Sequence, residues 1–319
     1  PSPVRVSTVQ PGTIAETPDS PKPLLNFALS LLIGLVIGFG ISVLRESLDL
    51  RLKSKDDVLE VADSVILGGV AFDEKAAEQP LIVHTSPRST QAESYRQLRT
   101  NVRFVEATGD KNSMVITSSV PNEGKTTTAC NLAIAIADTN KKVLLIDGDF
   151  RKPDVASYMG IVGAVGLSDV LIGQAQLKDV LQPWGAGNLT VLPAGSIPPN
   201  PSELLGSDLM VNLIAKLEKQ YDAVIIDAAP LLPVTDAAIL SHITGGVVLV
   251  VAMNKTTKPQ LEATINNLRA GNAKLLGTVL NKIPTKGASA KAYSYGYGYG
   301  YGYGYGKAPY GEAKEKQAK

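Results

Sequence analysis

The sequence predicts an α/β protein in which a doubly wound, mostly parallel β-sheet is covered by helices on both faces. Three observations lead to this fold class. From residue 113 on, short continuous apolar runs alternate with helical stretches, as in a parallel sheet buried on both sides. A glycine-containing loop joins the first run to the next helix, and two later runs end in aspartate. With 319 residues and 44% hydrophobic content, the chain can bury such a core.

The N-terminal part predicts a membrane helix ahead of the sheet. Residues 1–23 are polar and rich in proline, so we expect an extended, extracytoplasmic segment, and a first residue Pro1 suggests a fragment or a processed chain. Residues 24–44 carry no charge, and a helix of that length spans about 31 Å, the hydrocarbon thickness of a bilayer. The alternatives are a buried core helix or a signal peptide, although the stretch is long for a signal peptide and lacks its basic leader.

The charges that flank this span predict its orientation. Only Lys22 lies just before it, whereas several basic residues follow closely: Arg45, Arg51, Lys53 and Lys55. The positive-inside rule then places the N-terminus outside the plasma membrane and residues 45–319 in the cytoplasm. Small residues recur every four positions within the span, at Ser30, Gly34, Gly38 and Ser42. They would let a second helix approach, although glycine is also simply common in membrane helices.

Residues 45–88 are expected to be a juxtamembrane linker with a few local elements. Residues 54–57 resemble a capping box that opens a short helix, and 65–72 is a strand-like run. Residues 73–88 look like a loop. A second capping box begins at Thr90 and opens a helix that extends to about Val105.

Residues 89–284 are expected to form the α/β domain. We predict its strands at 114–117, 143–146, 189–192, 223–226, 247–251 and 275–280. The clearest helices are expected at 125–138, 208–219 and 259–270. After Pro284 the periodicity ends, so residues 285–319 are expected to be a flexible, disordered tail.

A phosphate-binding loop is the strongest chemical signal. The pattern G-x-x-x-x-G-K-[ST] is matched except that Ser119 replaces the first glycine, and the loop lies between a predicted strand and a predicted helix. Such a loop turns backbone N–H groups toward phosphate, while Lys125 supplies charge and the Thr126 hydroxyl a Mg²⁺ ligand. The pattern predicts a P-loop NTPase fold that binds ATP and Mg²⁺. The expected nucleotide-binding residues are Ser119, Val120, Pro121, Asn122, Glu123, Gly124, Lys125, Thr126 and Thr127.

Three aspartates are expected to meet near this loop. Asp147 and Asp227 each end an apolar run, and Asp149 follows two residues after the first. Because ligands of open α/β sheets bind at the carboxyl edge of the strands, these carboxylates would surround a phosphate–Mg²⁺ centre. For a single aspartate, a polar turn after a strand is the simpler interpretation.

The tyrosine distribution and the charge balance narrow the function further. Of the 11 tyrosines, most lie in a Tyr-Gly alternation near the C-terminus, at Tyr293, Tyr295, Tyr297, Tyr299, Tyr301, Tyr303, Tyr305 and Tyr310. For these tyrosines, a low-complexity tail without phosphate chemistry is the alternative.

The charge and the cysteine count exclude other classes of protein. The net charge of +1 gives no support for a nucleic-acid partner, and a single cysteine excludes an intrachain disulfide or a zinc site of paired cysteines.

Together these motifs resemble the bacterial tyrosine kinases of capsule and exopolysaccharide synthesis, over residues 17–310. The resemblance rests on the phosphate loop, the two aspartate boxes with Arg151, the segments 166–171 and 199–205, and the tyrosine tail. A further match is the spacing Glu93-x-x-Arg96-x-x-Arg99. The membrane helix is similar to the end of the family's chain-length-determinant membrane module.

The resemblance implies a role for each matching residue. Lys125, Asp147, Asp149 and Asp227 would be catalytic, and Thr126, Asp147 and Asp227 would hold Mg²⁺. Glu93, Arg96 and Arg99 would join subunits into a ring, so that one subunit's tail reaches the next active site; a solvated, salt-bridged helix face is the alternative. The resemblance also implies regulation of polysaccharide synthesis, chain length and export. Implied partners are membrane lipid, a phosphotyrosine phosphatase and polymerase or export proteins.

Some residues depart from the family pattern and keep two alternatives open. Asn122 stands where the family often has glycine, and Ala228 where it often has a hydroxyl, which bears on turnover more than on fold. One alternative is a partition or septum-positioning ATPase, but the signature lysine of those proteins is replaced by Val120. The other is a membrane-bound, nucleotide-sensing scaffold without catalysis.

Overall fold

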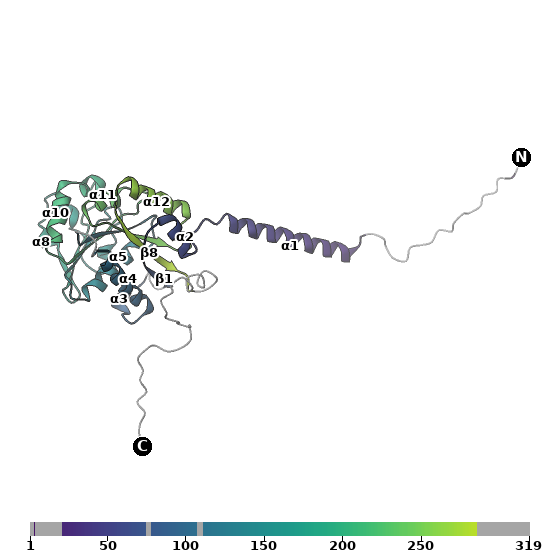
Figure 1. The fold of residues 1–319 in the computed structure, drawn as a ribbon, viewed down its shortest axis with the longest axis horizontal. Helices are drawn as coiled ribbons and strands as arrows, with labels where there is room; N and C mark the ends of the chain where they lie inside the picture. Colours follow the sequence, from purple (N-terminus) through teal and green to yellow (C-terminus); the bar gives the residue numbers. More distant parts are fainter. Residues whose placement is uncertain (1–2, 4–20, 75–77, 107–110, 286–319) are drawn as a thin grey trace, which may run out of the picture. The chain divides into compact units, whose positions relative to one another are not determined.

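The computed structural model describes residue 3 and residues 21–74, 78–106 and 111–285. The chain divides into two compact units, residues 1–50 and 51–319. In the described part, the first unit contains helix α1 and the second contains every other element (Figure 1). The expected tyrosine tail lies outside the described residues.

Helix α1 spans Pro23–Ser47 and contains the apolar stretch expected at 24–44. It has the length and composition of a membrane span, and none of its residues is buried. A side chain added at Gly34 or Gly38 would meet no atom within 4 Å, so this face of the helix is open. Association with a second helix stays a prediction.

The second unit is built on an eight-stranded sheet with the order β1-β8-β7-β2-β6-β3-β5-β4. All neighbouring strands are parallel except β4 and β5, which pair in antiparallel fashion. The strands are β1 (Ile66–Ala71), β2 (Ser113–Ser118), β3 (Val143–Asp147), β4 (Gln182–Trp184), β5 (Leu189–Leu192), β6 (Ala223–Asp227), β7 (Val247–Ala252) and β8 (Leu275–Ile283). The predicted doubly wound, mostly parallel sheet is confirmed.

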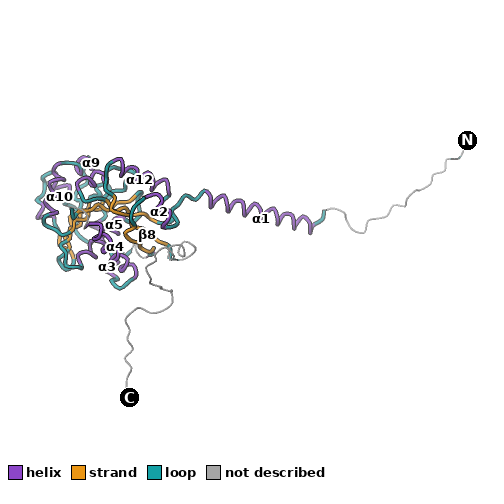
Figure 2. Tube along the Cα trace, in the orientation of Figure 1, coloured by secondary structure: helices purple, strands orange, loops and turns teal. Residues whose placement is uncertain are grey.

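Helices cover both faces of this sheet, as Figures 1 and 2 show. On one face lie α2 (Lys55–Ala62), α7 (Leu167–Leu171), α9 (Pro201–Leu205), α10 (Asp208–Glu218), α11 (Asp236–Ile243) and α12 (Lys258–Ala270). On the other lie α3 (Ile82–Thr85), α4 (Thr90–Glu106), α5 (Lys125–Ala137) and α6 (Val155–Met159). The short helix α8 (Leu177–Val180) precedes β4.

The continuous apolar runs follow from this two-sided burial. In β3, Leu144 and Ile146 belong to the core beneath α10 and α12, whereas Val143 and Leu145 belong to the core beneath α4 and α5. All four side chains are completely buried. Because successive strand residues point to opposite faces, a strand covered on both sides must be apolar at every position.

The structure corrects the sequence predictions at short elements. No strand is predicted between 147 and 188, yet Trp184 ends β4, a three-residue strand that is too short to show a pattern. Its indole Nε1 donates to the Met159 carbonyl at 2.8 Å. The region expected as a loop at 73–88 contains α3, and its Val83 is buried in the core.

One of the two predicted capping boxes is confirmed and the other begins one residue early. At α2, the Asp57 N–H donates to Ser54 Oγ at 3.1 Å, and the Ser54 N–H donates to Asp57 Oδ2 at 2.9 Å. At α4, the capping hydroxyl belongs to Ser89 instead of Thr90, because Ser89 Oγ accepts the Ala92 N–H at 3.1 Å.

Where we expected a juxtamembrane linker, much of the segment folds with the domain. The Leu52 N–H donates to the Thr256 carbonyl at 2.9 Å, and the Leu52 side chain is completely buried. Lys258 of α12 forms an ion pair of 2.9 Å with Asp57 of α2. Burial alone would raise the pKa of Asp57, but hydrogen bonds from Lys258, Lys53 and Ser54 lower it to about 2.

Removing core volume in the central sheet should destabilise the domain strongly. We expect Leu144→Ala to lower the free energy of unfolding by about 2–5 kcal/mol, because it deletes buried methyl groups and leaves a cavity. Leu209→Ala in α10 is the matched control, since Leu209 is 59% exposed and should cost about 0.5 kcal/mol or less. Chemical denaturation of the detergent-solubilised chain measures both. Equal losses of unfolding free energy in the two variants would contradict a core on both faces of the sheet.

Candidate active site

The phosphate loop joins the end of β2 to the start of α5. Asn122 and Gly124 adopt left-handed backbone conformations, with φ of 63° and 96°. A left-handed asparagine is tolerated better than most residues, so Asn122 can occupy the position where glycine is common. The loop therefore reaches the N-terminus of α5 in a conformation that suits anion binding.

Glu123 anchors this loop from behind. Its Oε2 accepts the Val120 N–H at 2.7 Å, and its Oε1 accepts the Ala252 N–H at 3.2 Å and the Thr256 hydroxyl. Burial raises the pKa of Glu123 despite these hydrogen bonds. The side chain points toward β7, so only the Glu123 backbone is available for the nucleotide contact that the sequence predicts.

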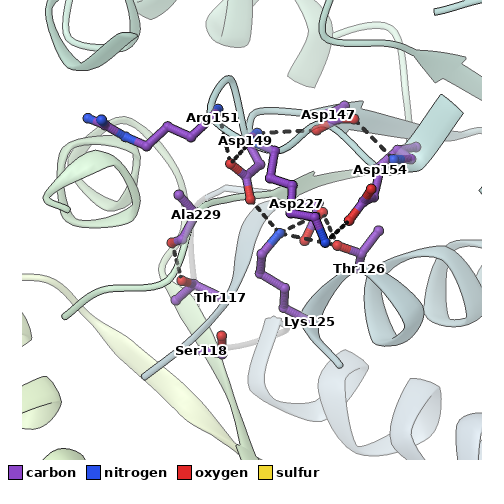
Figure 3. A network of polar contacts seen from close by, with 12 residues as sticks. Thr117, Ser118, Lys125, Thr126, Asp147, Asp149, Arg151, Asp154, Asp227 and Ala229 are labelled. Atoms are coloured by element: carbon purple, nitrogen blue, oxygen red, sulfur yellow. Dashed lines mark hydrogen bonds and ion pairs between the residues drawn. The ribbon is translucent and has the colours of Figure 1, made fainter. Parts of the chain in front are cut away.

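Lys125 lies between two carboxylates (Figure 3). Its ammonium is 2.8 Å from Asp149 Oδ2 and 3.1 Å from Asp227 Oδ2. The Thr126 hydroxyl donates to the same Asp227 oxygen at 2.6 Å. Burial alone would lower the pKa of Lys125, but the two carboxylates raise it, so the lysine is a permanent cation. The structure thus brings four predicted site residues together.

Asp147 completes the carboxylate cluster on the neighbouring strand. Asp147 and Asp227 are register partners on β3 and β6, and both are completely buried. Burial raises the pKa of Asp147, and the nearby charge of Asp227 raises it further. The two Asp147 oxygens accept backbone N–H groups from Asp149 at 3.2 Å and from Val155 at 3.1 Å. Asp147 therefore also shapes the turn that presents Asp149.

The donor set fits Mg²⁺ bound together with a phosphate. Asp227 Oδ1 is buried and has no hydrogen-bond partner among the described residues. The Thr126 hydroxyl lies beside the other oxygen of the same carboxylate. The described residues contain no group of three or more His, Cys, Asp or Glu side chains that could hold a metal alone. Mg²⁺ commonly takes one or two carboxylates, phosphate oxygens and waters, which matches this sparse site.

Arg151 extends the site toward α9 and α11 through contacts that the sequence did not reveal. Its Nε is 2.9 Å from Asp236 Oδ2, and one terminal nitrogen donates to Ser202 Oγ at 3.1 Å. Ser202 in turn donates to Asp236 Oδ1 at 2.5 Å. The segment 199–205, noted for its resemblance alone, thus supports the arginine. Asp236 follows no strand-like run, so no local signal could have identified it.

The segment 166–171 is structural. Asp169 Oδ2 accepts the Gly166 N–H at 2.8 Å, and Asp169 Oδ1 accepts the Ser196 hydroxyl at 2.7 Å. Burial alone would raise the pKa of Asp169, but these hydrogen bonds lower it. The aspartate therefore ties α7 to the loop after β5, and none of its described hydrogen bonds reaches the phosphate loop.

Two pockets adjoin the phosphate loop. One of about 250 Å³ is lined by Lys125, Asp149, Arg151 and Lys152 and has an apolar wall from Ala229, Pro230, Pro233 and Val234. The other, of about 380 Å³, is lined by Phe72, Pro80, Tyr95, Thr127, Asn281 and Lys282, among others. Asn122, Gly124, Thr127 and Tyr158 contribute to both pockets.

The three predicted oligomerisation residues lie on α4 but differ in their surroundings. Glu93 and Arg96 form an ion pair of 2.9 Å whose members are 57% and 31% exposed. Arg99 instead donates to the Ala135 carbonyl at 2.8 Å, near the C-terminus of α5. A cation there is favourable for the helix dipole. Glu93 is thus the exposed member of the three, whereas Arg96 also donates to the Pro87 carbonyl at 2.5 Å and Arg99 holds two helices of its own domain together.

The fold and the site define a P-loop nucleotide-binding protein, and residues 120–275 match the family described as AAA domain. The tyrosine-protein kinase YwqD of Bacillus subtilis (strain 168) is 42% identical over 204 residues, covering 64% of this chain and 86% of that protein. The tyrosine-protein kinase Etk of Escherichia coli (strain K12) is 30% identical over 305 residues, 89% of this chain and 42% of Etk.

The solved kinase domain of E. coli Etk matches with a TM-score of 0.69 at 30% identity, covering 76% of this chain and 98% of that domain. The chain therefore belongs to the bacterial tyrosine kinase family, and the enzyme class is protein-tyrosine kinase. The predicted family is therefore confirmed, in preference to the two alternatives, a partition or septum-positioning ATPase and a scaffold without catalysis. The individual residue roles stay predictions.

A substitution at Gly124 should abolish nucleotide binding. Its φ of 96° disfavours any side chain, and an added Cβ would collide with Asn281 Nδ2. Gly173→Ala is the matched control, because Gly173 has φ of 77° but open space around it. We expect Gly124→Ala to lose ADP affinity in equilibrium titrations and Gly173→Ala to keep it. Similar affinities in the two variants would mean that the close approach to Asn281 is unimportant.

Proposed function

We propose that this chain is an ATP-dependent tyrosine autokinase that phosphorylates its own C-terminal tyrosines in trans, within a ring-like homo-oligomer at the plasma membrane. The observation that carries the proposal is the Lys125 ammonium held between Asp149 and Asp227 at the mouth of the phosphate loop. Phosphoryl transfer needs positioning and charge neutralisation more than covalent chemistry, and this cluster supplies both. We further propose that the enzyme regulates the synthesis, chain length and export of capsular or extracellular polysaccharide.

The nucleotide is proposed to lie across the loop. Its phosphates would meet the backbone N–H groups at the start of α5 and the Lys125 ammonium. The 380 Å³ pocket beside Phe72 and Tyr95 is large enough for the nucleoside. Mg²⁺ would be held by the Thr126 hydroxyl and Asp227 Oδ1, with Asp147 as a further support, and would neutralise phosphate charge.

The acceptor tyrosine is proposed to enter the 250 Å³ pocket, where its ring would pack on the apolar wall formed by Ala229, Pro230, Pro233 and Val234. Phosphates that draw Lys125 away would free the Asp149 carboxylate. Asp149 then accepts the phenolic proton while the tyrosine oxygen forms its bond to the γ-phosphorus. The bond from that phosphorus to the β-phosphate oxygen breaks, and ADP leaves.

The tail provides the substrate in this proposal. Glycine is the most conformationally permissive residue, so a Tyr-Gly alternation would allow successive hydroxyls to enter one site. Each phosphate adds a charge of about −1.5 to −2, and a chain of net charge +1 would become strongly acidic. Repulsion between phosphorylated tails would favour dissociation of the ring. A phosphotyrosine phosphatase is the proposed partner that resets the tail.

The ring itself is proposed to use the exposed ion pair of Glu93 and Arg96. The membrane helix α1, with residues 45–319 in the cytoplasm, would keep the subunits in one plane next to lipid. Polysaccharide polymerase and export proteins are the proposed further partners.

Removing the loop lysine should abolish phosphorylation of the tail. We expect Lys125→Met to give no phosphotyrosine after incubation of the full chain with ATP and Mg²⁺, because the γ-phosphate loses its nearest cation. Lys178→Met, which removes an exposed lysine, should label normally. Mass spectrometry locates the modified residues. Labelling that survives Lys125→Met, or that falls only on Tyr95, Tyr158 or Tyr221, would disprove the proposal.

Transfer between subunits should depend on α4. Glu93→Ala combined with Arg96→Ala should leave ADP affinity intact but reduce tail phosphorylation at least about tenfold, because the acceptor comes from a neighbour. Glu262→Ala with Arg269→Ala on α12 is the matched control, since it removes the same charges from another exposed helix face. If the first double variant labels normally at dilute concentration, transfer is within one chain.

A mixing experiment tests the same step directly. A Lys125→Met chain with an intact tail is combined with an active chain whose tail tyrosines are all replaced by phenylalanine. Phosphotyrosine on the Lys125→Met chain is expected, and its absence would exclude transfer in trans.

A further inference from the structure

Two lysines from distant parts of the chain meet on the phosphate loop. Lys255 Nζ donates to the Pro121 carbonyl at 2.7 Å and to the Asn122 carbonyl at 3.1 Å. Lys282 Nζ donates to the same Asn122 carbonyl at 2.7 Å. Lys255 follows β7 and Lys282 lies near the end of β8, so two neighbouring strands each send one cation to the loop.

A third residue continues this pattern along the loop. Asn281 Nδ2 donates to the Glu123 carbonyl at 2.8 Å. Three consecutive carbonyl groups, from Pro121 to Glu123, are therefore each held by a side chain from β8 or from the loop after β7.

Because peptide units are planar, these carbonyl contacts also set the direction of the N–H groups in the loop. In a trans peptide unit the C=O of one residue and the N–H of the next point in opposite directions. Carbonyl groups turned toward Lys255, Lys282 and Asn281 therefore turn the N–H groups of Asn122, Glu123 and Gly124 the other way. Successive N–H groups that face one side of a loop form a concave anion site.

Placing Lys255 and Lys282 together on the loop is unfavourable in two ways, through charge repulsion and through backbone strain. Two ammonium groups share one carbonyl oxygen, so they repel each other. Burial lowers the pKa of Lys282, and the charge of Lys255 lowers it further. Lys282 also has a left-handed backbone, with φ of 55°, which a residue with a side chain seldom adopts. Local strain of this kind is typically retained at functional sites.

We propose that Lys255 and Lys282 are positioning residues for phosphate binding, which fix the peptide units of the loop with their N–H groups toward the nucleotide. Both lysines hold the loop by its carbonyl groups, and none of their described contacts reaches Lys125 or the three aspartates. Lys282 also lines the 380 Å³ pocket proposed for the nucleoside. This inference rests on the proposed binding of ATP at the loop.

The test compares ADP affinity in the full, detergent-solubilised chain by titration with a fluorescent ADP analogue. Lys255→Met and Lys282→Met should each weaken binding about tenfold or more, and the double variant about a hundredfold, since each loses charge-assisted hydrogen bonds. The melting temperature should change little. Lys255→Arg keeps the charge and donors and should bind within about threefold of the unmodified protein. Lys178→Met is the matched control for lost charge and should bind normally.

Kinetics separate positioning from a general structural effect. In the lysine variants the KM for ATP should rise while kcat at saturating ATP stays within about threefold, because neither lysine reaches the reacting atoms. Unchanged ADP affinity in the Lys255 and Lys282 double variant would overturn the inference. So would a loss in Lys255→Arg as large as that in Lys255→Met, or an equal loss in Lys178→Met.

Gly124→Ala separates this inference from the proposed function. If Gly124→Ala weakens ADP binding but the double variant does not, only the positioning role is wrong. If Gly124→Ala and the double variant both bind ADP normally, the nucleotide does not bind at this loop and both proposals fail.

Discussion

The ion pairs of Lys125 with Asp149 and Asp227 are the interaction on which the site depends. Two carboxylates lie within 3.1 Å of one ammonium in a buried setting, where an unpaired charge would be costly. The pairing lets the protein keep two carboxylates and a cation at the end of its sheet before any ligand arrives. The phosphate oxygens of an incoming nucleotide would replace these carboxylates as the anions next to Lys125.

The sheet order explains how these groups meet. Strand β6 lies between β2 and β3, so the phosphate loop after β2 is next to Asp227 and close to the Asp147 box. Every neighbouring pair among these strands is parallel, and their carboxyl ends therefore share one edge. Helices on both faces force each strand to be apolar along its length, which leaves only the strand ends for charged residues.

The loop after β7 connects the site to the start of the folded unit. Thr256 accepts the Leu52 N–H through its carbonyl and donates its hydroxyl to Glu123, which itself holds the Val120 N–H. Lys255 of the same loop holds two carbonyls of the phosphate loop. Leu52, which follows the expected membrane helix, is thus linked through Thr256 to Glu123 of the phosphate loop.

The sequence by itself determined the sheet class, most strands to within a few residues, and the convergence of Lys125, Thr126 and the aspartates. These features are local: a buried parallel strand must be a continuous apolar run, and a phosphate loop needs its glycine, lysine and hydroxyl at fixed spacing. Short elements such as β4 and α3 escaped because a few residues cannot display a period.

Only the tertiary structure decided which distant side chains support the site. Asp236 and Ser202 hold Arg151, and Lys255 and Lys282 hold the loop, across sequence separations of 34 to 160 residues. It also showed that the three α4 residues differ: Glu93 is exposed, Arg96 donates to the Pro87 carbonyl, and Arg99 binds α5. Such contacts depend on where the chain returns in space, and no spacing along the sequence records that.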